Sequence, residues 1–236
     1  LSRPLPSDPG FSRTRFLLDG GRLHTVCQEA RCPNCGECFS LGTAAFLILG
    51  ERCTRRCRFC AVTQGTPEGP DPDEPRRVAE AAARMSLDYV VVTSVTRDDL
   101  PDGGAGFFAE TIRSLRALLP SARIEVLVPD FRGDEGALRT VLEARPDVLN
   151  HNLETVRRLQ PLIRPQADYE RSLQVLRRAA RRRPRTLVKS GLMLGMGETD
   201  GELRQTLLDL RDSGCRALTL GQYLAPSRQH FPVARY

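Results

Sequence analysis

Three cysteines fall within a stretch of eight residues, Cys53, Cys57 and Cys60, and the aromatic Phe59 stands beside the last of them. A structural zinc ion or a fully ligated electron-transfer cluster takes four protein ligands. A [4Fe–4S] cluster bound by only three thiolates keeps one iron free for another molecule. These residue types at this spacing therefore predict a cluster that does chemistry.

A second group of four cysteines lies upstream within twelve residues, at Cys27, Cys32, Cys35 and Cys38. Its overlapping CxxC pairs resemble half of a zinc site, but the sequence offers no matching second half, and His24 is too isolated to count as a ligand. Spacings this short do not suit a disulfide framework in a large domain. Metal ligation explains the crowding better, although this pattern alone leaves the metal open.

The elements that must position these cysteines follow a repeated βα pattern, typical of a parallel sheet with helical crossovers. We expect six buried strands, at residues 44–49, 89–93, 124–128, 148–152, 187–193 and 218–223. Helices are expected near residues 76–85, 107–119, 135–144, 169–181 and 199–213. Six such units form a partial (β/α)6 barrel, a TIM-like α/β fold that is open on one side.

Polar residues follow several of the predicted strands, at Thr93, Ser94 and residues 150–154. In barrels the carboxyl ends of the strands form the rim that carries the chemistry. Within this group, Asn152 and Glu154 offer an amide and a carboxylate that can grip the vicinal diol of a ribose; the alternative is a buried capping pair. Two Pro-rich stretches, 3–10 and 66–75, are expected to be linkers within one domain.

Length and composition suit one large α/β domain, because 40% of the 236 residues are hydrophobic. No apolar run is long enough to span a membrane, and residues 1–20 lack the order of a signal peptide. We expect a soluble protein of the bacterial cytoplasm. Because the sequence begins at Leu1 rather than at methionine, a removed targeting segment would not be visible, which leaves a mitochondrial matrix open.

The formal net charge is +6, and Lys189 is the only lysine among 35 basic residues, so the positive surface is almost entirely guanidinium. The densest basic run spans residues 177–185. A solvated helix face is the favoured interpretation, and docking of an acidic partner is the alternative.

The cysteine spacing resembles two known motifs. Cys53, Cys57 and Cys60, placed after the first barrel strand, resemble the signature of the radical S-adenosylmethionine (SAM) superfamily. Cys27, Cys32 and Cys38 resemble the auxiliary-cluster motif of lipoyl synthases, as do the stretches 93–104, 128–133, 150–155 and 221–226. The resemblance implies an N-terminal extension over residues 1–43 that carries the auxiliary motif, and a radical SAM barrel over residues 44–236.

The resemblance to lipoyl synthases implies two [4Fe–4S] clusters and SAM as cofactors. The Cys53 cluster would bind SAM and cleave it to a 5′-deoxyadenosyl radical. The cluster on Cys27, Cys32 and Cys38 would supply the sulfur atoms inserted at C6 and C8 of a protein-bound octanoyl chain. Residues expected to contact SAM are Phe59, Thr93, Ser94, Asn152, Glu154, Arg164 and Gly195. Of these, Arg164 suits a carboxylate because its planar guanidinium can donate two parallel hydrogen bonds to the two carboxylate oxygens.

The implied partners are octanoylated lipoyl carrier domains, namely 2-oxoacid dehydrogenase acyltransferase subunits and the glycine cleavage H protein. A flavodoxin- or ferredoxin-type protein would donate electrons, and neither nucleic acid nor membrane is expected. Two departures stand out. The sequence stops at Tyr236 before the serine-containing tail motif of the family, as in a truncated member, and most relatives lack a cysteine at the position of Cys35.

Two rival functions fit part of the pattern. A tRNA methylthiotransferase also joins radical chemistry to an auxiliary cluster, but the sequence shows no RNA-binding extension and few aromatic residues for stacking on bases. A zinc-stabilised binding barrel without catalysis is the rival from another class.

Overall fold

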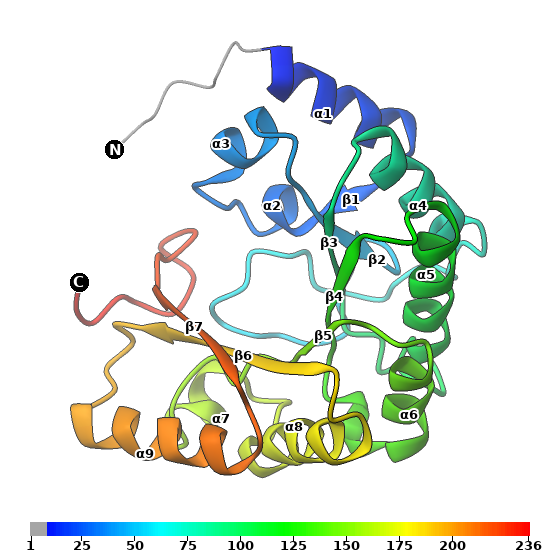
Figure 1. Cartoon of the computed structure of the whole chain (residues 1–236). Coiled ribbons are helices and arrows are strands. Elements are labelled where there is room, and N and C mark those ends of the chain that lie inside the picture. Colours follow the sequence, from blue (N-terminus) through cyan, green and yellow to red (C-terminus); the bar gives the residue numbers. More distant parts are fainter. Residues whose placement is uncertain (1–8) are drawn as a thin grey trace.

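The computed structural model describes residues 9–236. Its sheet holds seven strands in chain order, and β1 (His24–Thr25) pairs antiparallel with β2 (Ala45–Ile48). The following strands all pair in parallel: β3 (Tyr89–Ser94), β4 (Arg123–Leu127), β5 (Val148–Asn150), β6 (Leu187–Leu194) and β7 (Ala217–Gln222). Since β1 and β7 form the two edges, the sheet curves without closing (Figure 1). The prediction of a partial radical SAM barrel is confirmed: its six parallel strands are β2 to β7, and the short antiparallel β1 was not predicted.

The crossover helices cover the outer face of this curved sheet (Figure 1). They are α4 (Glu74–Arg84), α5 (Ala105–Leu118), α6 (Glu135–Glu143), α7 (Gln160–Ile163), α8 (Tyr169–Arg182) and α9 (Asp200–Asp212). The core lies between the helices and the sheet, where strand residues such as Phe46, Val90 and Ile124 are fully buried. All five predicted helices are present, whereas the four-residue α7 was not predicted.

Ahead of the barrel, the chain forms α1 (Pro9–Gly20), α2 (Val26–Glu29) and α3 (Cys35–Ser40), seen at the top of Figure 1. Helix α1 rests on α3, because the Thr14 hydroxyl donates to the Phe39 carbonyl and the Phe11 and Phe39 rings lie 5.7 Å apart. The predicted boundary between residues 43 and 44 falls just before β2 and stays a prediction.

Both predicted linkers need correction. Of the stretch 3–10, residues 3–8 lie outside the described part of the chain, and Pro9 and Gly10 begin α1. The stretch 66–75 ends inside α4, which begins at Glu74 with Pro75 in its first turn, where proline is well tolerated. Among residues 9–236, no helix has the length and apolar character that crossing a bilayer requires.

Candidate active site

The loop that follows β2 presents Cys53, Cys57 and Cys60, and backbone hydrogen bonds fasten it at both ends. The Cys53 N–H donates to the Thr63 carbonyl at 2.8 Å, and the Thr54 N–H donates to the Thr96 carbonyl, just past β3, at 3.0 Å. Farther along, the Arg58 N–H donates to the Ile163 carbonyl at the end of α7 (2.8 Å). The loop that carries the three cysteines is therefore held in place by hydrogen bonds to the segment after β3 and to the end of α7.

All three of these thiols line a cavity of about 660 Å³ at the carboxyl ends of the strands. This volume falls within the range of about 300–1,000 Å³ that is common for ligand pockets. The cavity also brings together six residues that the sequence predicted as SAM contacts: Phe59, Thr93, Ser94, Asn152, Glu154 and Arg164. These residues therefore meet at the rim of the barrel, where barrel enzymes have their active sites.

The second cysteine group reaches the same cavity. Cys32 lies in its wall together with Val26, Ala30 and Asn34, so the N-terminal segment closes one side of the space above the sheet. Cys27, Cys35 and Cys38 are not among the described residues that line the cavity. The two motifs, separated in sequence, are therefore neighbours in space.

The thiols of the first motif lie in different electrostatic surroundings. Burial raises the pKa of Cys60 to about 12, and burial also raises the pKa of Cys57, opposed by the nearby Arg164 guanidinium. The Cys53 sulfur accepts the backbone N–H groups of Thr96 (3.3 Å) and Arg55 (3.4 Å). Bound metal would displace the thiol protons, and such N–H···S bonds tune the potential of a bound cluster.

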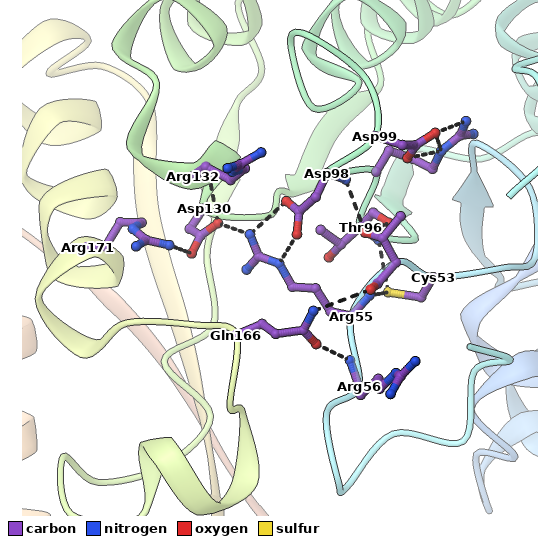
Figure 2. Close-up of polar contacts among 12 residues, drawn as sticks. Cys53, Arg55, Arg56, Thr96, Asp98, Asp99, Asp130, Arg132, Gln166 and Arg171 are labelled. Atoms are coloured by element: carbon purple, nitrogen blue, oxygen red, sulfur yellow. Dashed lines mark hydrogen bonds and ion pairs between the residues drawn. The ribbon is translucent and has the colours of Figure 1, made fainter. Parts of the chain in front are cut away.

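Arg55, between the first two cysteines, anchors the loop to two carboxylates, Asp98 and Asp130 (Figure 2). Its side chain is 4% exposed and donates to both oxygens of Asp98 (2.7 and 2.9 Å) and to Asp130 (2.6 Å), while Arg171 reaches the other Asp130 oxygen at 3.3 Å. Burial alone would raise the pKa of Asp130, but the Arg55 guanidinium outweighs it and lowers that pKa to about 2. Asp98 follows β3 and Asp130 follows β4, so one buried arginine ties the cysteine loop to two strand ends.

Polar atoms without partners mark the cavity as a site for a polar ligand. Within residues 9–236, Ser94 Oγ, His151 Nε2 and Arg164 Nε are buried and have no hydrogen-bond partner. Buried polar atoms are nearly always paired. The His151 Nδ1 lies 2.8 Å from the Val128 carbonyl and must donate to it, so Nε2 offers a lone pair to the cavity. Burial lowers the pKa of His151 to about 4, which keeps the ring neutral.

This arrangement fits a three-thiolate cluster with SAM better than it fits zinc. Tetrahedral zinc holds sulfur at about 2.3 Å, which brings its ligand sulfurs to within about 3.8 Å of one another. In the described chain, three or more His, Cys, Asp or Glu ligand atoms gather within 4.8 Å only at His24, Glu29 and Glu51, and no cysteine takes part. The three-thiol donor set and the unpaired polar atoms suit a larger, liganded cofactor.

Gly195, the seventh predicted SAM contact, lies apart from the cavity lining formed by the described residues. Its carbonyl accepts the Ala234 N–H at 2.7 Å, and a Cβ there would meet the Arg235 carbonyl oxygen at 2.3 Å, so the C-terminal segment covers it. On the strand that precedes Gly195, β6, Met193 lines the cavity instead. A Cβ on Gly191 would come within 2.7 Å of Asn152 Oδ1, so the glycine lets Asn152 approach the strand.

Sequence reasoning missed the roles of Arg55, Gly191 and Met193. Alternation within the predicted strand could have indicated Met193, whereas the partners of Arg55 are visible only in three dimensions. His230 has a structural role: its ring contacts Ser227 Oγ at 2.8 Å and the Cys60 carbonyl at 3.2 Å.

The comparisons with known proteins agree with this geometry. Residues 47–210 match the model of the Radical SAM superfamily. The fold resembles methylornithine synthase (PylB), with a TM-score of 0.59, 14% identity, and 97% of this chain and 67% of that chain covered. It also resembles HydG, a maturase of the [FeFe]-hydrogenase, with a TM-score of 0.63, 17% identity, and 79% and 44% covered. The cysteine loop at the rim of a partial barrel is thus that of a radical SAM protein.

Closer relatives narrow the class. The lipoyl synthase of Nitratidesulfovibrio vulgaris (strain Hildenborough) is 60% identical over 232 residues, which cover 98% of this chain and 77% of that protein. The lipoyl synthase of Rubrobacter xylanophilus is 53% identical over 236 residues, with 100% and 74% covered. The chain belongs to the lipoyl synthases, radical SAM enzymes that insert sulfur.

Proposed function

We propose that this chain inserts two sulfur atoms, at C6 and C8 of a protein-bound octanoyl chain, with one [4Fe–4S] cluster on Cys53, Cys57 and Cys60 and a second on Cys27, Cys32 and Cys38. The observation that carries the proposal is the shared cavity. Because Cys32 lines the same cavity as the first motif, the cluster that supplies sulfur and the cluster that generates the radical would both reach a substrate bound there.

Different residues of the cavity would bind different parts of SAM. When bound, the first cluster and SAM supply a reductive cleavage that yields a carbon-centred radical. Arg164 donates through Nη1 to the Asn152 and Leu153 carbonyls (3.1 and 3.3 Å), which fixes its fork and leaves Nε for the SAM carboxylate. Asn152 and Glu154 would grip the ribose diol. Glu154 is in turn held by its backbone N–H, which donates to the Gly191 carbonyl at 2.9 Å.

Apolar side chains supply the rest of the wall. Leu47, Val62, Leu127 and Met193 line the cavity beside the thiols. They offer an octanoyl chain a surface that removes it from water. The proposed substrates are octanoylated lipoyl carrier domains, including acyltransferase subunits and the glycine cleavage H protein, and a flavodoxin- or ferredoxin-type protein would supply electrons. A bacterial cytoplasm is the proposed location, with a mitochondrial matrix as the alternative.

Anaerobic reconstitution tests the cofactors. We expect about eight irons and eight sulfides per chain, and about half of each after Cys53, Cys57 and Cys60 are all replaced by alanine. Stoichiometric zinc without labile sulfide would overturn the proposal.

Activity assays test the division of labour. Replacing Cys32 by alanine should abolish lipoyl product on an octanoylated carrier while SAM cleavage continues, because cleavage requires only the first cluster. Loss of both activities in a folded variant that keeps the first cluster would show that the two motifs do not act separately.

A further inference from the structure

The chain beyond β7 forms a strap, residues 227–235, that is fastened to the cysteine loop after β2. The Phe231 N–H donates to the Arg58 carbonyl at 2.8 Å. The His230 ring lies 3.2 Å from the Cys60 carbonyl oxygen through its Nε2. The Arg58 guanidinium also stands over the Phe231 ring, 5.3 Å from the ring centroid. Two consecutive strap residues therefore hold the part of the loop that ends at Cys60.

The far end of the strap is fixed to the end of β6. The Ala234 and Arg235 N–H groups both donate to the Gly195 carbonyl, at 2.7 and 3.2 Å. Gly195 directly follows Leu194, the last residue of β6. The strap leaves β7, the last strand of the open sheet (Figure 1), whereas the cysteine loop leaves β2, its first parallel strand. The strap therefore connects the two sides of the open barrel at the carboxyl ends of the strands.

Between these two attachments, the strap shares a small apolar core with the cysteine loop. Phe231 and Val233 of the strap and Phe59 of the loop all pack against one buried group, which is separate from the main core. This group consists of Val156, Leu159, Ile163, Met196 and Tyr223. The Tyr223 hydroxyl also donates to the Phe231 carbonyl at 2.8 Å. Separating the strap from the loop would expose this apolar surface to water, which is unfavourable.

The His230 ring is oriented from within the strap before it reaches the loop. A carbonyl oxygen only accepts hydrogen bonds, so Nε2 carries a proton and donates it to the Cys60 carbonyl. The other ring nitrogen, Nδ1, lies 2.8 Å from Ser227 Oγ, and this contact fixes the rotation of the ring. The His230 N–H donates to the Ser227 carbonyl at 3.2 Å, so a closed turn holds the backbone as well. The contact with the loop is therefore built into the strap.

We infer that His230 is a positioning residue for the first cluster. Through the Cys60 carbonyl, it fixes the end of the cysteine loop relative to β6, the strand to which the strap is tied. The inference rests on the proposed function, which places a [4Fe–4S] cluster on this loop and SAM in the cavity beside it. Reacting groups must be aligned closely for catalysis, and small displacements slow it. Without the His230 hydrogen bond, the loop keeps its three cysteines but loses one of its fixed contacts with the opposite side of the barrel.

The test measures reductive SAM cleavage by the reconstituted protein, together with the change that SAM makes in the EPR spectrum of the reduced first cluster. His230→Leu removes the donor, and Gln229→Leu is the matched control because Gln229 is the preceding residue and is exposed. We expect His230→Leu to lower kcat per cluster about tenfold and to alter the SAM-induced spectrum, whereas the control changes neither. His230→Gln should restore most of the rate, because its amide N–H can donate to the carbonyl.

A merely structural role would lower the amount of cluster and leave these values per cluster unchanged. A His230→Leu protein that matches the control in rate and spectrum would therefore overturn the inference, as would equal defects in His230→Leu and His230→Gln.

Hydrogen exchange measured by mass spectrometry tests the strap without any substitution. In the reconstituted, unchanged protein, the peptides that contain the Phe231 and Ala234 amides should exchange slowly, because both N–H groups are bonded to carbonyls. Adding SAM should slow exchange in the strap and in the cysteine loop together. Exchange of residues 227–235 at the rate of an unstructured peptide, with and without SAM, would overturn the inference. Failure of the same protein to cleave SAM would instead overturn the proposed function, and the protection of the strap would still be measured.

Discussion

At the scale of single residues, His151 links the cavity to the stability of the fold. Its side chain is 1% exposed, and burial lowers its pKa from 6.5 to about 4. Above pH 6.5 the ring is neutral in the folded and unfolded states and contributes no pH dependence. Between pH 6.5 and 4 His151 is protonated in the unfolded chain but stays neutral in the folded chain. The free energy of unfolding therefore falls by about 1.4 kcal/mol for each unit by which the pH is lowered.

We therefore expect His151→Gln to flatten the acid limb of the stability profile. From pH 7 to pH 4, the free energy of unfolding of the unchanged protein should fall by about 3 kcal/mol more than that of the variant. Urea titrations at several pH values measure the difference. The control is His230→Gln, in which a half-buried histidine is removed. Parallel profiles for the unchanged protein and His151→Gln would show that His151 is not held neutral.

Arg55 is a positioning residue for the cysteine loop. Lysine in its place keeps the charge but cannot bond Asp98 and Asp130 together through a planar fork. We expect Arg55→Lys to bind nearly normal amounts of iron, to shift the midpoint potential of the first cluster, and to slow SAM cleavage about tenfold, since small misplacements of reacting groups are costly. The control is Arg56→Lys on the same loop, whose side chain is exposed. Unchanged potential and cleavage in Arg55→Lys would contradict the role.

At the scale of elements, the strands and crossover helices were predictable because each buries a continuous apolar run. The helices of the N-terminal segment were not, since α1 is stabilised by contacts with Phe39, which lies 25 residues beyond Thr14 in the chain. The cluster cysteines were recognisable because their ligand spacing is local. The partners of Arg55 lie 43 and 75 residues away, so no local pattern could reveal them.

The inner face of the sheet carries an ionic network that spans four strands. Glu125 on β4 is 3% exposed and accepts from Lys189 on β6 (2.9 and 3.1 Å), Asn150 on β5 (3.0 Å) and Tyr89 on β3. Removing one partner of a buried pair leaves an uncompensated charge. We expect Lys189→Met to lower the free energy of unfolding by about 3 kcal/mol.

A second substitution separates lost pairing from lost packing. Adding Glu125→Gln to Lys189→Met removes the stranded charge and should restore much of the stability. Urea titration of both single variants and the double variant measures the coupling. If the effects of the two substitutions simply add, the network does not act as a unit.

At the scale of the whole molecule, the basic run of α8 lies away from the cavity. Helix α8 ends at Arg182 and leads into the start of β6, so residues 181–185 lie at the amino ends of the strands, whereas the cysteine loop lies at the carboxyl ends (Figure 1). Earlier in the run, Arg178 donates to the Gly133 carbonyl (2.9 Å) and pairs with Glu135 (2.8 Å). An octanoyl chain must enter at the cavity, which favours the solvated-face interpretation of this run.

Two other arginines flank the cavity and are better placed to meet an acidic carrier domain. Arg31 precedes Cys32 and Arg56 precedes Cys57, and both are exposed. Complementary charges mainly raise the association rate and make it sensitive to salt. We expect Arg31→Glu with Arg56→Glu to slow association with an octanoylated carrier about tenfold at low ionic strength, and the deficit should shrink as salt is added.

The matched control is Arg181→Glu with Arg182→Glu, because either double variant lowers the formal net charge from +6 to +2. Stopped-flow association rates over a range of ionic strengths compare the two. A similar loss in both variants would mean that net charge alone steers the carrier, whereas a loss confined to the control would place the docking surface on α8. A loss confined to Arg31→Glu with Arg56→Glu would place it at the mouth of the cavity, where the reacting carbon atoms must arrive.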